Sequence, residues 1–117
     1  MRVTPLYFVD PAPGSKYFQP ISLNRFVAIH VELANVGTGL YLDTTSNGAR
    51  VDAGGRLRRA LIIDTAEPGL NRPRLQPGRS KTGTLSFEIP RAARVSSLRL
   101  TLDSDFGPET GVWTFSR

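Results

Sequence analysis

The sequence predicts an all-β fold in which two antiparallel sheets pack face to face. Hydrophobic residues recur at every second position in several segments, whereas helical periodicity is nearly absent. Glycine and proline account for 11 and 9 of the 117 residues, and they favour turns between these segments. About seven short strands of this kind are typical of a two-sheet sandwich. We expect one domain spanning residues 1–117.

The clearest strand covers residues 26–35. Alternate side chains give it one apolar face, formed by Val27, Ile29, Val31 and Leu33. The other face is mixed and carries Ala28, His30, Glu32 and Ala34. Asn35, Gly37 and Gly39 follow directly and predict the turn that ends the strand.

Two further strands show the same alternation. In residues 84–89 the inward positions are Leu85, Phe87 and Ile89, and the outward positions are Thr84, Ser86 and Glu88. Pro90 ends this strand because it has no amide to donate. In residues 97–103 the inward Leu98, Leu100 and Leu102 alternate with Arg99, Thr101 and Asp103.

The remaining elements are shorter. Residues 6–9 predict an opening edge strand, and residues 112–115 a closing one. Residues 50–52 and 57–63 flank a glycine turn and predict a hairpin. We expect one helical turn at residues 92–95, and a long surface loop at residues 65–78, which hold three prolines.

The composition excludes several kinds of site. The chain has no cysteine and one histidine, which excludes thiol catalysis, a zinc knuckle, an iron–sulfur cluster and any disulfide. No cofactor is expected. No apolar run reaches the roughly 18 residues of a membrane helix, and the first residues do not resemble a signal peptide. The chain is then either intracellular or a domain of a longer, exported protein.

The charge balance is basic. Lysine and arginine number 15 against 10 acidic residues, and the pI is about 10.4. We interpret the densest group as a solvated basic face, with contacts to an anionic ligand as the alternative; the group consists of Arg56, Arg58, Arg59, Arg72, Arg74 and Arg79. No aromatic residue stands among them, which argues against nucleic acid, because single-strand sites interleave basic and aromatic side chains.

Two groups of residues suggest a functional site, one catalytic and one for calcium, and each also has a purely structural interpretation. His30 is the one candidate general base and shares a strand face with Glu32, but no Gly-x-Ser-x-Gly motif accompanies it. Asp103, Asp105 and Glu109 form an acidic segment that suggests calcium, with Asp43, Asp52 and Asp64 as further candidate ligands. EF-hand spacing is missing. We therefore favour a sheet histidine and turn-capping aspartates, and expect no enzyme.

Three segments carry a family resemblance. Residues 25–37 contain the strand and its asparagine–glycine turn, residues 75–90 a proline–glycine turn and an aromatic-centred strand, and residues 111–115 a closing strand with Trp113. In these segments the chain resembles the immunoglobulin-like domain of unknown function found in actinobacterial lipoproteins and membrane-anchored proteins, related to secreted mycobacterial immunoprotective antigens. The resemblance implies an immunoglobulin-like sandwich outside the cytoplasm and provides no active site.

The function expected is therefore a non-enzymatic, extracytoplasmic binding, adhesion or accessory module with a protein or cell-envelope partner. Its expected contact regions are residues 11–20, 40–50 and 65–78. The alternative is a basic surface that binds an anionic polymer, namely a cell-wall polymer, lipid or nucleic acid. A small hydrolase using His30, a spacer domain, a cytoplasmic location and a homodimer formed through an open sheet edge also remain open.

Overall fold

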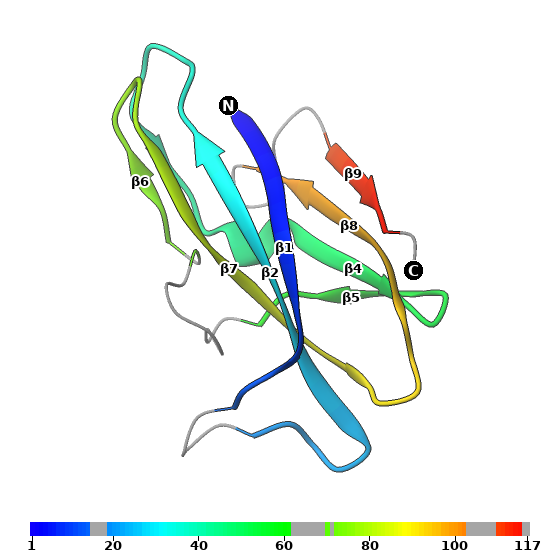
Figure 1. Ribbon diagram of the computed structural model, residues 1–117. Coiled ribbons are helices and arrows are strands. Elements are labelled where there is room, and N and C mark those ends of the chain that lie inside the picture. Colours follow the sequence, from blue (N-terminus) through cyan, green and yellow to red (C-terminus); the bar gives the residue numbers. More distant parts are fainter. Residues whose placement is uncertain (15–18, 62–69, 71, 103–109, 116–117) are drawn as a thin grey trace.

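The computed structural model describes residues 1–14, 19–61, 70, 72–102 and 110–115 (Figure 1). Within these residues the chain forms nine strands and one short 3-10 helix. Their bounds are β1 (Arg2–Ala12), β2 (Asn24–Ala34), β3 (Tyr41–Leu42), η1 (Thr45–Gly48), β4 (Ala49–Ala53), β5 (Arg56–Arg59), β6 (Arg74–Leu75), β7 (Ser80–Pro90), β8 (Val95–Thr101) and β9 (Thr110–Thr114).

The strands form two principal sheets, and every strand pair is antiparallel. One sheet has the order β1-β2-β7 and the other β5-β4-β8-β9, while β3 and β6 pair separately. Figure 1 shows β1, β2 and β7 in one layer and β4, β5, β8 and β9 in the other. The predicted immunoglobulin-like sandwich is confirmed.

The main core lies between these two layers. All four residues of the predicted apolar face of β2 are at most 1% exposed, and the inward residues of β7 are at most 2% exposed. Val51, Leu98 and Leu100 close the core from the opposite sheet. The alternation of residues 26–35 and 84–89 therefore predicts the inner faces of both strands correctly.

The outer face of β2 is buried as well, at the end near its first residues. Phe26 and Ala28 pack there with Ala12, and Val9 and Leu61 pack against them, forming a second, smaller core. The sequence predicted a mixed outer face. Burial at this end depends on Ala12 and Leu61, which come from other parts of the chain.

Thr84 and Ser86 were predicted to point outward, but both are buried. The cause is that Leu61 and Leu70 lie along the free edge of β7. The backbone amide of Leu61 donates to the carbonyl of Ser86 at 2.7 Å, and that of Leu70 donates to Thr84 at 3.1 Å. Leu61 and Leu70 therefore cover this edge. The outward direction of Thr84 and Ser86 is confirmed, because they stand opposite His30 and Ala28 on the outer face, but both are buried there.

The opening and hairpin strands have different bounds from those predicted. β1 is longer than residues 6–9 and continues through Pro5 and Pro11, which an edge strand tolerates because one side needs no amide. Its register with β2 shifts between Pro5 and Tyr7 and again between Val9 and Ala12. The predicted hairpin turn is confirmed by positive φ at Gly54 (65°) and Gly55 (80°). Its second strand ends at Arg59, short of the residue 63 predicted; residues 62 and 63 lie outside the described residues.

Two loop predictions also need correction. Residues 92–95 form no helical turn, because β8 already begins at Val95. In residues 65–78, of which 65–69 and 71 lie outside the described residues, Leu70 and Leu75 are buried and β6 pairs with β3. The part of this segment that the structure describes is therefore partly built into the core.

Candidate functional site

The six arginines predicted to bind an anion do not come together. Arg56, Arg58 and Arg59 lie on β5, at the edge of the four-stranded sheet. Arg74 lies on β6, with Arg72 before it and Arg79 after it. β5 and β6 belong to different sheets, so closeness in sequence does not produce one patch.

The three arginines of β5 are also divided between its two faces. Arg56 stands opposite Ala53 and Arg58 opposite Val51, and both partners are completely buried. Opposed side chains share a face, so these two arginines point toward the core side of the edge. The Nε of Arg58 is buried and has no hydrogen-bond partner among the described residues.

Arg59 belongs to a row of arginines on the outer face of the same sheet. It stands directly opposite Arg50 on β4, which in turn stands opposite Arg99 on β8. Arg59 and Arg99 are exposed, and Arg50 is half-buried. Neighbouring strands lie about 4.8 Å apart, so the arginine row (Arg59, Arg50 and Arg99) crosses three strands over about 10 Å.

Arg50, the middle member of the arginine row, already has an interaction partner in the fold. Asp52 lies on the same face, two residues along β4, between Leu57 and Ser97. No carboxylate of the described residues forms an ion pair with Arg59 or Arg99. Sequence reasoning missed Arg50 and Arg99 because it followed local density. Their outward positions on the predicted strands 50–52 and 97–103 were the available signal.

A second basic feature lies at the end of the three-stranded sheet. A pocket of about 370 Å³ holds two arginines on its walls and is lined by Arg2, Ala34, Asn35, Val36, Gly37, Gly78, Arg79 and Ser80. Arg79 belonged to the predicted anion-binding group, whereas Arg2 did not. Of that group, Arg79 alone lines this pocket.

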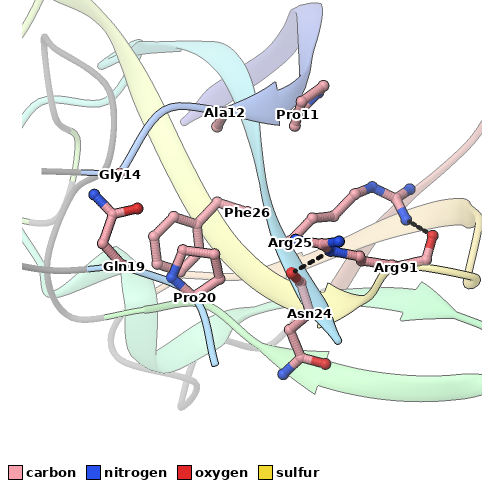
Figure 2. Close-up of a pocket in the computed structure, with 9 residues that line it drawn as sticks. All are labelled: Pro11, Ala12, Gly14, Gln19, Pro20, Asn24, Arg25, Phe26 and Arg91. Atoms are coloured by element: carbon pink, nitrogen blue, oxygen red, sulfur yellow. Dashed lines mark hydrogen bonds between the residues drawn. The ribbon is translucent and has the colours of Figure 1, made fainter. Parts of the chain in front are cut away.

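A pocket of about 410 Å³ lies where β1 ends and β2 begins (Figure 2). Phe26 and Pro20 lie on one side of it, and Arg25 and Arg91 on the other. The Arg25 guanidinium donates to both carboxylate oxygens of Asp10, at 2.8 and 3.1 Å, and to the carbonyls of Pro90 and Arg91. Arg25 therefore clamps three segments of the fold, and its charge is matched by Asp10.

His30 lies on the outer face of β2 in an aromatic stack. Its ring is 4.2 Å from that of Tyr7, centroid to centroid, with 16° between the planes. Its Nδ1 is buried and has no hydrogen-bond partner among the described residues. Burial lowers the pKa of His30 below its usual 6.5. The contacts are those of a packed ring pair.

The acidic segment predicted for calcium cannot be placed. Asp64, Asp103, Asp105 and Glu109 lie outside the described residues. Of the other two, Asp43 accepts hydrogen bonds from the Tyr41 hydroxyl and the Thr44 amide. Among the residues that the structure describes, no three acidic or histidine side chains gather where they would hold a metal.

The predicted contact regions are described only in part. Residues 15–18 and most of 65–71 lie outside the described residues, and residues 40–50 include η1, whose Thr45 is buried and bonded to the carbonyl of Leu70. Part of residues 40–50 therefore packs into the fold. No helix of the described residues has the length and apolar character needed to cross a membrane.

The fold is similar to that of a candidate lipoprotein, YcdA, from Bacillus subtilis subsp. subtilis str. 168. The two structures agree with a TM-score of 0.72 over 97% of this chain, at 16% sequence identity. The match covers 35% of the YcdA chain, so this chain spans about a third of that protein's length. No protein-family model and no curated protein sequence matches this chain. The likeness establishes the fold, and the actinobacterial resemblance stays a prediction.

Proposed function

We propose that this chain is a non-enzymatic, extracytoplasmic interaction module that binds an anionic polymer of the cell envelope through the arginine row. The location is supported by the fold shared with a candidate lipoprotein and by the resemblance to immunoglobulin-like domains of actinobacterial lipoproteins. The absence of an enzyme activity rests on the residues: the single histidine is packed against Tyr7.

The observation that carries the ligand class is the placement of like charges. Like charges at directly opposed positions of a sheet repel and destabilise it. Arg59, Arg50 and Arg99 occupy such positions. Arg50 already has a partner in the fold. An anionic polymer lying across the strands would therefore form charge-assisted hydrogen bonds with the exposed Arg59 and Arg99, and such bonds are about twice as strong as neutral ones.

The composition of the face favours an envelope polymer over nucleic acid. The other outward residues beside the row offer no aromatic ring on which a base would stack; they include Asp52, Leu57, Ser97, Val112 and Thr114. A polymer recognised only by its charge needs no such ring. Recognition of this kind depends strongly on salt.

The experiment is to measure binding to a linear polyphosphate at several salt concentrations. Removing two contacts in the Arg59→Gln/Arg99→Gln variant should reduce the slope of log K against log salt by about two. The charge-matched control is Arg91→Gln/Arg94→Gln, because both arginines are exposed and lie outside the row. The proposal would be refuted if the slopes of log K against log salt were equal in the two variants. It would also be refuted if polyphosphate binding by the wild type did not change with salt concentration.

A further inference from the structure

We propose that the pocket between Arg2 and Arg79 is a separate binding site for a phosphate monoester group. This inference does not depend on the arginine row, which lies on the other sheet. It rests on three features of the pocket: its floor, its walls and its charge.

The floor is set by the register of the three-stranded sheet. Arg2 on β1, Ala34 on β2 and Ser80 on β7 occupy directly opposite positions, and such side chains share one face. Ala34 contributes only a methyl group and is 6% exposed. A small residue between two longer ones leaves a depression, flanked by the side chains of Arg2 and Ser80.

The end wall is made by two turns that are bonded to each other. The Asn35 amide donates to the carbonyl of Arg79, and the Gly78 amide donates back to the carbonyl of Asn35, both at 2.8 Å. The Asn35 side chain accepts from the Gly37 amide at 3.0 Å and donates to the carbonyls of Gly39 and Leu75. The backbone carrying Arg79 is therefore held in place before any ligand arrives.

The charge of the pocket is positive on both sides. Arg2 and Arg79 both line it, and no carboxylate does. The acidic residue of β2 on this face is Glu32, one step along the sheet between Thr4 and Thr82, and no ion pair joins it to Arg2 or Arg79. Two guanidinium forks with a hydroxyl beside them match a group that has two negative charges and three acceptor oxygens.

The volume agrees with a small group. About 370 Å³ lies near the lower end of the range for small-molecule pockets. The amides of Asn35, Gly37 and Gly78 already have partners, so recognition falls to the side chains of Arg2, Arg79 and Ser80.

The test is an NMR titration of the chain with inorganic phosphate at constant ionic strength. Saturable shifts are expected at the amides of Gly37, Gly78 and Ser80. Arg2→Gln and Arg79→Gln should each weaken binding about tenfold, as expected for the loss of one charge-assisted bond. Arg79→Lys should weaken it less, because the charge remains while the fork is lost.

The matched control is Arg59→Gln/Arg99→Gln, which removes the same charge from the other sheet and should leave phosphate binding within twofold of wild type. Conversely, Arg2→Gln/Arg79→Gln should retain the salt-dependent binding of polyphosphate chains. Failure of one proposal is thereby separated from failure of the other. Two results would refute the proposed phosphate site: phosphate binding that survives in Arg2→Gln/Arg79→Gln, or phosphate binding that falls equally in both double variants.

Two ligand sources share this chemistry, a free phosphomonoester and the headgroup of phosphatidic acid. Vesicles with and without phosphatidic acid distinguish them. Retention on the phosphatidic acid vesicles that Arg2→Gln/Arg79→Gln abolishes would assign the lipid, and phosphate binding without such retention would assign a soluble ligand.

Discussion

The indole ring of Trp113 lies over Gly111, so that a Cβ added to Gly111 would stand 2.5 Å from Cη2 of the ring. Both residues face the core side of β9, opposite Leu100 and Leu98. The missing side chain of Gly111 is therefore what admits the ring, and the need for glycine here is steric.

Gly111→Ala is accordingly expected to destabilise the protein by about 1–3 kcal/mol, because the ring or the strand must move to remove the overlap. Urea unfolding followed by tryptophan fluorescence measures this directly, since the chain has one tryptophan. Gly39→Ala is the control: a Cβ at Gly39 meets nothing within 4 Å, so it should change stability by less than about 0.5 kcal/mol. Equal effects would contradict the steric explanation.

Asn35→Ala is expected to cost about 2–3 kcal/mol. The side chain is buried, and its removal leaves the carbonyl of Leu75 without the amide donor that Asn35 supplies at 2.9 Å. Asn35→Asp should be at least as harmful, because it places a carboxylate oxygen against the same carbonyls. Thermal unfolding of both variants tests this, and a harmless aspartate would show that the donated bonds contribute little.

Arg25→Ala should destabilise the fold by about 3 kcal/mol, because it breaks a largely buried ion pair with Asp10 and removes donors from two carbonyls. Arg25→Lys should recover only part of this loss, since an ammonium group cannot form the paired bonds to Asp10. Arg94→Ala, at an exposed position, provides the control in denaturant titrations. Full recovery with lysine would show that charge alone is needed.

Stability should fall as the pH is lowered from 7.5 to 5.5. Burial lowers the pKa of His30 in the folded state below 6.5. The unfolded chain therefore binds the proton more readily, and acidification favours the unfolded state. This loss of stability begins as the pH falls through about 6.5, the pKa of histidine in the unfolded chain. It is complete once the pH is well below the pKa of His30 in the folded protein. Because the chain has one histidine, His30→Gln should remove most of this slope in urea titrations at fixed pH values, and an unchanged slope would contradict the assignment.

The inner faces of the sandwich were predictable because they follow period-two alternation alone. The alternate hydrophobic residues of β2 and β7 are buried as the alternation requires, namely Val27, Ile29, Val31, Leu33, Leu85, Phe87 and Ile89. Burial of Thr84 was not predictable, since it depends on Leu70, which approaches from a distant part of the chain.

The candidate sites depend even more on register. Arg59, Arg50 and Arg99 become neighbours only when three strands pair in one alignment, and a shift of one residue would send them to the other face. Arg2 and Arg79 line one pocket because the start of β1 and the turn before β7 both lie beside the end of β2. Local arginine density, the signal available in the sequence, reports neither arrangement.

The covered edge of β7 also limits how molecules of this chain can assemble. The sheet β1-β2-β7 is covered on one side by Leu61 and Leu70, and on the other side its strand contains Pro5 and two register shifts, features that discourage pairing with another strand. In the four-stranded sheet, β5 is short and rich in arginine, which leaves β9 as the most receptive of the described edges. A molecule with one edge strand open to pairing can form only a dimer, whereas a molecule with two such edges can form a fibre. For the edges that the structure describes, we therefore expect self-association by strand pairing to give a dimer and not a fibre.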